Sequence, residues 1–441
     1  MADVPPSESS AGEYPVRVAP RGANIGTRSH PLRASLSAEM HVRRLPRFSA
    51  PARLMQVVTL LGEAGAAESW RHISDLAARA GLTIAERAKY AVVPLPGATL
   101  VWERHTEFAT YTFIREGAFG APFDPQHFAP LSDDVLAGMP GDVIRATQIA
   151  VQPRDAPPPF DSELDQWFTR EALVVCDIVG GKARLMSDFR LHADGFGRLL
   201  IRDMGLEGDE PSQLVTRVQE LGNYRNMALL GLPIAQETTP ELTKLEQRLA
   251  TLTHDVSERR SQDDALLDEL TFLSAELARL SAATRYRMSA TRAYAQLSIE
   301  RLHALDLVAV RGFQTLGDFT ERRLMPAVRT CDSFSARIED LQQRAAWASA
   351  LLRTRIDIAL AKQNRDLLES MDRRTQLQLR LQQTVEGLSV VAISYYLIGL
   401  IAYPIKAIDG INHEVAIGIA VPIVILTVAL FVNRMRRHFK E

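Results

Sequence analysis

The sequence predicts an α+β domain, followed by a long helical coiled-coil stalk and a C-terminal two-helix transmembrane hairpin. Three patterns predict these parts. Strand-like and helical segments alternate over residues 30–235, leucines recur at heptad spacing over residues 236–386, and two uncharged apolar runs occupy 387–405 and 415–432. A chain of 441 residues is long enough for two or three domains, so all three parts fit within it.

The N-terminal segment 1–29 is rich in Pro, Ser and Gly and contains no apolar core. A secretory signal needs such a core, and a segment without one buries too little apolar surface to fold. We therefore expect a disordered N-terminal tail and no signal peptide.

The α+β domain is expected to begin with the order strand, helix, strand, strand, helix, strand. This order is typical of a ferredoxin-like βαββαβ layer, in which one sheet carries helices on one face. We expect Pro153–Pro159 to form a loop before a group of extra antiparallel strands, with Gly180-Gly181-Lys182 as a hairpin turn among them. The predicted elements are a strand at 54–61, a helix at 67–80, strands at 99–103 and 108–114, a helix at 132–139, and strands at 143–151, 172–179, 183–191 and 197–202.

The densest cluster of polar residues in this domain is Asp188, His192 and Asp194. A metal or acid–base role would require these side chains to converge. We expect instead a solvated strand and turn, with Asp194 and Gly195 as the turn residues. The nearby Gly195-Phe196-Gly197 lacks the third glycine of a dinucleotide fingerprint and lies between strands rather than before a helix.

No other motif in the chain indicates catalysis or metal binding. GxxxxGK[ST], HExxH, CxxC and GxSxG are all absent. His41, beside Arg43 and Arg44, is interpreted as a structural histidine, and Cys176 and Cys331 lie far apart, as in a reduced cytoplasmic protein. The sequence thus predicts no catalytic residue, no cofactor and no metal site.

The overall charge gives no indication of nucleic-acid binding. Lys and Arg total 51 and Asp and Glu total 53, for a formal net charge of −2. A nucleic-acid-binding domain is usually strongly basic. We therefore expect no nucleic-acid partner.

The stalk of residues 236–386 shows two heptad seams, and a coiled coil that mediates homo-oligomerisation is their expected cause. We expect Pro240 to open the first helix, and a last long helix to run from about Met325 into the first apolar run. Gln363 and Asn364 would either fix the register of this coiled coil or lie exposed. The seam residues are Leu242, Leu245, Leu249, Leu252, Val256, Leu266, Leu270, Leu273, Leu277 and Leu280, and then Cys331, Phe334, Ile338, Leu341, Ala345, Ala348 and Leu352.

The two apolar runs, 387–405 and 415–432, contain no charge. Each has about the 20 residues that a helix needs to cross the hydrocarbon core, and the connector between them is too short to be a domain. The pair therefore predicts a transmembrane hairpin. A buried helical hairpin in a soluble protein is the alternative.

Basic residues near the ends of the spans predict the orientation. The tail 433–441 carries four fixed positive charges, whereas the connector has Lys406 against Asp409 and Glu414. Because Lys and Arg concentrate on the cytoplasmic side, we expect both termini to be cytoplasmic and the connector to be outside. The basic residues of the tail are Arg434, Arg436, Arg437 and Lys440.

Several stretches resemble a known family. RRLMPAVRTC (322–331), LLRTRIDIALAKQNRDLLESM (351–371) and LQLRLQQTVEGLSVVAISYYLIGLIAY (377–403) closely resemble bacterial domain of unknown function 3422. HPLR (30–33) and EMHVRRLPRFSAPAR (39–53) are similar to its N-terminal signature, whose usual His-Ala-Arg-Pro reads His-Val-Arg-Arg here. The resemblance implies a protein anchored in the bacterial inner membrane, and it implies no activity.

The layout is also similar to that of CorA-type magnesium channels, which combine a cytoplasmic α/β domain, long helices and a C-terminal two-span hairpin. Their Gly-Met-Asn motif is absent, and Tyr403-Pro404-Ile405 stands at about that place. The similarity is therefore one of layout, which does not establish function.

The function expected from the sequence is a scaffold or regulatory role for a cytoplasmic domain held at the membrane, with no assignable reaction. An oligomeric cation channel or transporter is the main alternative, and an enzyme with a site in the soluble domain is a third. The apolar runs lack the charges that usually mark ion pathways, which favours the scaffold. A channel would be lined by Ser389, Ser394, Tyr395, Tyr396 or Thr427, with Asp409 and Glu414 as an outer acidic ring.

Overall fold

The structure of the chain is a computed structural model. It describes residues 30, 32–33, 36–37, 44–62, 64–86, 88–124, 128, 133–258, 263–406 and 413–438. The chain divides into two compact units. The first comprises Met1–Ala250 and Leu273–Arg344, and the second comprises Thr251–Phe272 and Ala345–Glu441. The predicted tail 1–29, His41 and most of the connector between the apolar runs lie outside the described residues.

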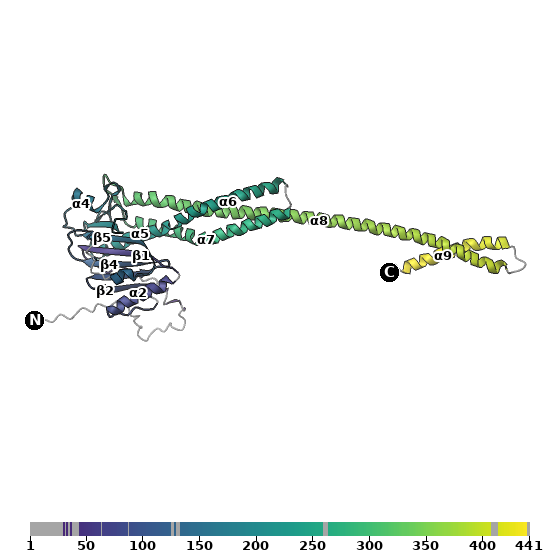
Figure 1. The fold of residues 1–441 in the computed structure, drawn as a ribbon, viewed down its shortest axis with the longest axis horizontal. Coiled ribbons are helices and arrows are strands. Elements are labelled where there is room, and N and C mark those ends of the chain that lie inside the picture. Colours follow the sequence, from purple (N-terminus) through teal and green to yellow (C-terminus); the bar gives the residue numbers. More distant parts are fainter. Residues whose placement is uncertain are drawn as a thin grey trace. The chain divides into compact units, whose positions relative to one another are not determined.

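The first unit contains a mixed sheet of nine strands in the order β2-β3-β4-β1-β5-β8-β7-β6-β9 (Figure 1). Neighbouring strands are antiparallel except β5 and β8, which pair in parallel and join the two halves of the sheet. The strands are β1 (Ala52–Leu60), β2 (Tyr90–Leu95), β3 (Ala98–Arg104), β4 (Phe108–Glu116), β5 (Asp142–Gln152), β6 (Val174–Ile178), β7 (Ala183–Ser187), β8 (Gly197–Asp203) and β9 (Val308–Ala309).

Short helices connect the strands, and the long helices α5 to α9 come mostly after the strands in the sequence. α6, α7 and α8 each contribute residues to both compact units. The helices are α2 (Gly65–Arg79), α3 (Asp133–Ala137), α4 (Asp161–Trp167), the 3₁₀ helix η3 (Arg170–Ala172), α5 (Glu210–Leu229), α6 (Gly231–Glu258), α7 (Asp263–His303), α8 (Leu316–Lys406) and α9 (His413–His438).

Helices cover both faces of the sheet. Successive side chains of a strand point to opposite faces. On β1, Met55 packs in the cluster that includes Ile73 of α2, whereas Leu54 packs in the cluster that includes Leu214 of α5. On the second half of the sheet, α4 joins the α2 face through Leu164. These three apolar clusters enclose the strands from both sides.

Most of the predicted elements of the domain are present, with boundaries shifted by a few residues. Strand β2 was not predicted, because Pro94 interrupts its pattern; proline is tolerated there because β2 lies at the sheet edge. Helices α4 and α5 and the two-residue strand β9 were also missed. Three strands rather than two therefore separate α2 from α3. The strands of the expected ferredoxin-like layer belong to a larger mixed sheet, and the ferredoxin-like arrangement itself stays a prediction.

The heptad seams are buried inside a single chain. In the first unit, Leu249 of α6, Leu277 of α7 and Ile338 of α8 are all buried. In the second unit, Leu270 of α7 and Leu352 of α8 are fully buried. These three helices thus bury most of the seam residues within a single chain.

Ion pairs between the three helices accompany the buried seams. In the first unit Arg337 of α8 bonds Glu246 of α6 at 2.6 Å. In the second unit Arg355 of α8 pairs with Asp263 of α7 at 2.8 Å. Because these pairs are partly exposed, each adds little stability compared with the buried leucines.

Two predicted helix boundaries are wrong. Pro240 lies inside α6, which begins at Gly231, and α8 begins at Leu316 with Pro326 inside it. An interior proline costs a helix about 3 kcal/mol, so a sequence-based boundary there is reasonable. Burial of neighbouring residues such as Ala235 and Leu242 outweighs that cost for α6.

The prediction that α8 continues without a break into the first apolar run is confirmed. Beyond Leu352, no residue of α8 from Arg353 to Ile393 is buried. Two helical segments are long and apolar enough to cross a membrane, with mean hydropathies of 1.8 in α8 and 2.9 in α9. Only 6% and 11% of these two windows are buried within the chain.

A hydrogen bond in the α2 face supplies a first test. The Ser69 hydroxyl accepts the Nε1–H of Trp102 at 2.8 Å and bonds the Tyr111 hydroxyl at 2.8 Å, and all three side chains are fully buried. Ser69→Ala should lower the free energy of unfolding by about 1–3 kcal/mol, because it leaves a buried N–H without its acceptor. Urea denaturation of the full chain in detergent, followed by tryptophan fluorescence, measures the change.

Ser74, on the same helix, is the matched control. Its Oγ is buried and has no hydrogen-bond partner among the described residues. Ser74→Ala should therefore change stability by less than about 0.5 kcal/mol. Equal effects of the two substitutions would contradict the assigned hydrogen bond.

Candidate functional site

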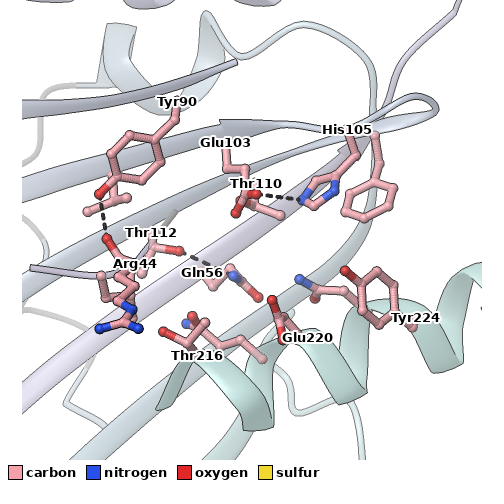
Figure 2. A pocket seen from close by; sticks show the side chains of 15 residues that line it. Arg44, Gln56, Tyr90, Glu103, His105, Thr110, Thr112, Thr216, Glu220 and Tyr224 are labelled. Atoms are coloured by element: carbon pink, nitrogen blue, oxygen red, sulfur yellow. Dashed lines mark hydrogen bonds and ion pairs between the residues drawn. The ribbon is translucent and has the colours of Figure 1, made fainter. Parts of the chain in front are cut away.

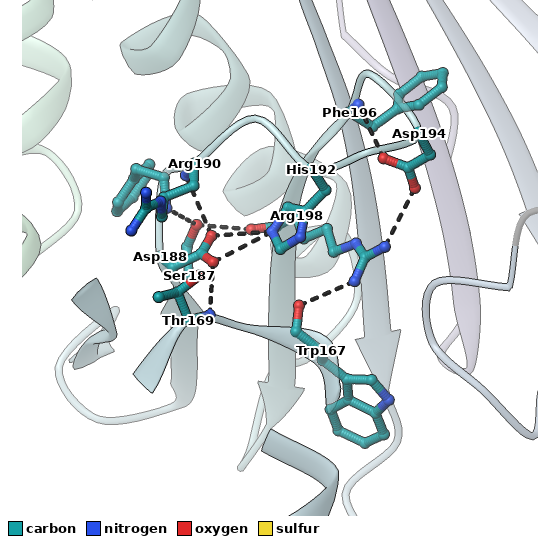
Figure 3. Close-up of polar contacts among 10 residues, drawn as sticks. Trp167, Thr169, Ser187, Asp188, Arg190, His192, Asp194, Phe196 and Arg198 are labelled. Atoms are coloured by element: carbon teal, nitrogen blue, oxygen red, sulfur yellow. Dashed lines mark hydrogen bonds and ion pairs between the residues drawn. The ribbon is translucent and has the colours of Figure 1, made fainter. Parts of the chain in front are cut away.

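Asp188, at the end of β7, is the centre of the polar cluster seen in the sequence. Its carboxylate accepts the backbone N–H of Thr169 at 2.8 Å and that of Arg190 at 3.2 Å, and it bonds His192 Nε2 at 3.2 Å (Figure 3). Asp188 is only 2% exposed, so the expectation of a solvated residue is wrong at this position. The carboxylate ties the loop after β7 to the segment before η3.

Asp194 and Gly195 form the predicted turn between β7 and β8. The Gly195 N–H donates to the His192 carbonyl at 2.9 Å, and Gly195 has φ of 80°, which glycine adopts without strain. Asp194 accepts the Phe196 N–H at 3.1 Å and pairs with Arg198 at 3.3 Å. Both carboxylates of the cluster are thus engaged by backbone and basic partners.

The cluster does not form a nucleophilic site. The Ser187 hydroxyl donates to the Arg198 carbonyl at 2.6 Å and accepts the Phe189 N–H at 3.1 Å. A serine nucleophile requires its proton to be directed at a base, and this proton is directed at a carbonyl. Within the described ranges, no group of three or more His, Cys, Asp or Glu side chains is placed to hold a metal ion.

A polar pocket lies between the first half of the sheet and α5. Figure 2 shows Gln56, Thr110 and Thr112 on the strands facing Thr216 and Glu220 on the helix. The Gln56 amide donates to Thr112 at 3.2 Å. The cavity holds about 30 Å³, which is enough for one or two water molecules.

Several polar contacts lie at the rim of the pocket. The Tyr90 hydroxyl donates to the Arg44 carbonyl at 2.5 Å, and burial together with the Glu103 carboxylate raises the pKa of Tyr90 to about 12. His105 lies 3.6 Å from Glu103, and Glu220 is paired with Arg301 at 2.5 Å. A carboxylate and an imidazole therefore lie beside a space of about 30 Å³.

The remaining residues singled out in the soluble part have structural positions. Cys176 of β6 and Cys331 of α8 are both free and buried, and burial raises the pKa of both thiols. A buried thiol with a raised pKa is unreactive. Gln363 and Asn364 are exposed on α8.

In the channel alternative, hydroxyl residues of the apolar runs line the pore. Two of them, Ser389 and Thr427, donate hydrogen bonds to their own helices. Ser389 donates to the Val385 carbonyl at 2.8 Å and Thr427 to the Ile423 carbonyl at 2.7 Å. Ser394 is buried. The side chains of Tyr395, Tyr396 and Glu414 are exposed, and Asp409 lies outside the described residues.

A buried network of arginine and amide groups was missed by sequence reasoning. Arg145 of β5 donates to the side-chain oxygen of Gln56 at 2.8 Å and to that of Asn223 on α5 at 2.9 Å. These residues come from three distant segments, and none stands in a motif. The alternation of strand residues places Arg145 on the same face as Ile149, which is the only sequence signal for its burial.

A family model described as "Protein of unknown function (DUF3422)" matches residues 28–439. The chain belongs to the DUF3422 family. No curated protein matches it. Membership confirms the resemblance drawn from the stalk and N-terminal segments, whereas the likeness to CorA-type channels is one of layout. The description of DUF3422 names no reaction, so the chemistry of the chain must be inferred from its own residues.

The Asp188 carboxylate is expected to be a structural requirement in this DUF3422 protein. Asp188→Asn replaces one acceptor oxygen with an NH₂ group that faces other donors, so it should lower the free energy of unfolding by about 1–3 kcal/mol. Asp165→Asn is the control, because Asp165 is more than half exposed and its pairing with Arg170 at 3.3 Å is a surface interaction. Urea denaturation of both variants checks this, and equal stabilities would contradict it.

Proposed function

We propose that the protein is an integral membrane protein of the bacterial inner membrane that holds its α+β domain and helical bundle in the cytoplasm, where they act as a scaffold or regulatory module. The exposure of the apolar segments of α8 and α9 is the observation that carries this proposal. Leu388, Val391 and Leu400 of α8 are each more than 60% exposed. A soluble helical hairpin would bury such residues, and water would make them sites of aggregation.

A bilayer provides an apolar environment for the exposed side chains of the two segments, whereas water does not. Within an α-helix every interior backbone group is hydrogen-bonded, so the helix can face lipid on all sides. Val415, Ile419 and Ile423 of α9 are exposed, and no charged residue interrupts its apolar run. Hydroxyls that bond their own helix, as Ser389 and Thr427 do, are also compatible with lipid.

The basic C-terminal tail supports the orientation. Its four Lys and Arg residues follow the second apolar segment directly, and such residues are retained in the cytoplasm. Two crossings then return the chain to its starting side, so the α+β domain is also cytoplasmic in this proposal.

A membrane-topology reporter tests both insertion and orientation. A phosphatase reporter that is active only outside the cytoplasm should be active when inserted after Gly410 and inactive when fused after Glu441. A fusion truncated after Glu386, which lacks both apolar segments, should be inactive and should leave the membrane fraction. Activity at neither position would show that the segments do not cross, and the reverse pattern would show the opposite orientation.

We further propose that copies associate through the exposed part of α8 as a parallel coiled coil. The bundle buries its own seams, but apolar residues continue along one side of α8 beyond Leu352. Successive positions of this stripe, including the polar Gln363, Arg374 and Gln378, are three or four residues apart, as in a coiled-coil seam with polar interruptions. The apolar residues of this stripe are Ile356, Leu360, Leu367, Met371, Leu381 and Val385.

Charge substitutions on and off the stripe test this association. Leu367→Asp with Leu381→Asp should raise the dissociation constant of the oligomer at least about tenfold, because the interface would bury unpaired carboxylates. Leu368→Asp with Leu379→Asp is the matched control, since these leucines are equally exposed but lie off the stripe. Light scattering of the full chain in detergent measures the size. A monomeric wild-type protein, or equal effects of the two pairs, would contradict the proposed interface.

A further inference from the structure

A second pocket, here called the arginine pocket, is formed by β5, the loop after β7, β8 and α5. Its volume is about 180 Å³, several times that of the pocket in Figure 2. Of its described lining residues, four are arginines and none is Asp or Glu. The arginines are Arg145 of β5, Arg190 of the loop, Arg198 of β8 and Arg225 of α5.

Arg225 is partly buried, and no carboxylate among the described residues is paired with it. Its guanidinium carbon lies 4.9 Å from the ring centroid of Phe189 and 5.6 Å from that of Phe319. Its Nη1 is buried and has no hydrogen-bond partner among the described residues. Buried guanidinium groups usually bond a carboxylate or phosphate, because an unpaired buried charge is costly. The two rings hold the group in place, and a donor remains free.

Arg145 adds a second, partly buried charge. Its described hydrogen bonds go to the neutral amide oxygens of Gln56 and Asn223. Gly222 of α5 makes room for it, because a Cβ there would lie only 2.8 Å from the Arg145 guanidinium carbon. The group is thus packed directly against the α5 backbone.

Neighbouring positive charges also oppose the charged forms of both arginines. Burial, and then repulsion by Arg225, lowers the pKa of Arg145 to about 9. Burial, and then repulsion by Arg323, lowers the pKa of Arg225 to about 10. An arginine keeps its proton at neutral pH, so these directions indicate that the charged forms are held at a cost.

The other two arginines of the pocket, Arg198 and Arg190, differ in whether a carboxylate neutralises them. Arg198 is neutralised by Asp194 at 3.3 Å. Arg190 is exposed, and its backbone N–H rather than its guanidinium bonds Asp188 (Figure 3). In the part of the chain that the structure describes, three arginines of the pocket therefore have no carboxylate bound to them. A dianion would balance most of this charge.

We propose that the arginine pocket binds a phosphate-type oxyanion, either inorganic phosphate or a phosphomonoester, through Arg225 and Arg145 with Arg190 at its exposed side. Guanidinium groups match the oxygens of phosphate in bidentate geometry. A phosphate dianion balances two of the three charges, whereas a carboxylate balances one. The phosphoryl group can belong to a soluble molecule or to a lipid headgroup. The inference does not depend on membrane anchoring, since every residue in it lies in the first unit.

Thermal denaturation of the full-length protein tests the site. The protein, in a neutral detergent and a phosphate-free buffer, is titrated with sodium phosphate and, separately, with sodium chloride at equal ionic strength. Phosphate should raise Tm increasingly with concentration, because a ligand that binds the folded state alone stabilises it by mass action. Chloride should not reproduce this rise.

Arg225→Gln distinguishes ligand binding from a packing role. The phosphate Kd should rise about tenfold to a hundredfold, as expected for loss of a charge-assisted hydrogen bond. Without phosphate, the Tm of this variant should equal or exceed that of the wild type, because an unpaired buried charge has been removed. A residue that mattered only through its ring contacts would lower Tm in both buffers.

Two further variants serve as controls for folding and position. Arg190→Glu changes an exposed residue, so it should fold normally and still raise the phosphate Kd. Arg217→Gln lies on the same helix as Arg225 but outside the pocket, with its guanidinium donating to the Ala304 carbonyl at 3.3 Å. It should leave the phosphate Kd unchanged.

Bilayers of two compositions distinguish a soluble phosphate ligand from a lipid headgroup. Protein in phosphatidylcholine bilayers is compared with protein in bilayers that also contain phosphatidic acid, a phosphomonoester lipid. A Tm rise with inorganic phosphate assigns a soluble ligand, and a rise with phosphatidic acid alone assigns a headgroup. The proposal is overturned if neither differs from its control, or if Arg225→Gln and Arg190→Glu both retain the wild-type response.

Discussion

The parallel pairing of β5 with β8 is the contact on which the α+β unit depends. It joins five strands on one side to four on the other, and each half is otherwise held by antiparallel neighbours. Ile149 pairs with Leu199 in this register, and both are buried under α5, while Ala150 and Leu200 are buried on the opposite face. Parallel strands require cover on both faces because their helical connections place apolar residues on each. The position of α5 follows from this requirement, and α5 in turn supplies one wall of both pockets.

Sequence reasoning succeeded where a pattern is local and failed where packing between distant segments decides. The seam residues Leu270 and Leu352 were identified by spacing alone, because a helix brings residues three and four apart to one side. The β5–β8 pair could not be predicted, since no turn or periodicity connects two strands separated by β6 and β7. Pro240 was mistaken for a helix start because its local cost is real, although burial of the surrounding helix outweighs it. The arginine pocket could not be predicted from the sequence either, because it too depends on packing between distant segments. Arg145 and Arg225 resemble surface arginines until β5 and α5 are packed together.

The two exposed parts of α8 call for different surroundings. In residues 353–386 apolar side chains alternate with charges and amides, and the apolar stripe runs along one side of the helix. A protein partner that covers that side and leaves the charges in water satisfies it. The following apolar run has no charged side at all, and a bilayer covers the whole circumference. The change from one pattern to the other falls at Glu386, so the proposed self-association and the proposed membrane insertion would occupy adjacent parts of one helix.

The arginine pocket is difficult to explain as a device for stability. Replacement of buried charged groups by apolar residues of similar volume is often neutral or stabilising. Stability alone therefore gives no reason to place arginines in this pocket, and their presence indicates another use. Arg225 contacts Phe319 of α8 as well as Phe189 of the loop, and these two rings stack at 4.6 Å. Phe189 is held at a φ of 52°, a conformation that is strained for a bulky residue and that persists only when its surroundings impose it. An oxyanion bound to Arg225 would neutralise the group around which α5, the loop and the first turn of α8 meet. Because ligand binding stabilises only the state in which the site is formed, occupancy would favour the docked form of that turn over any form in which it is released.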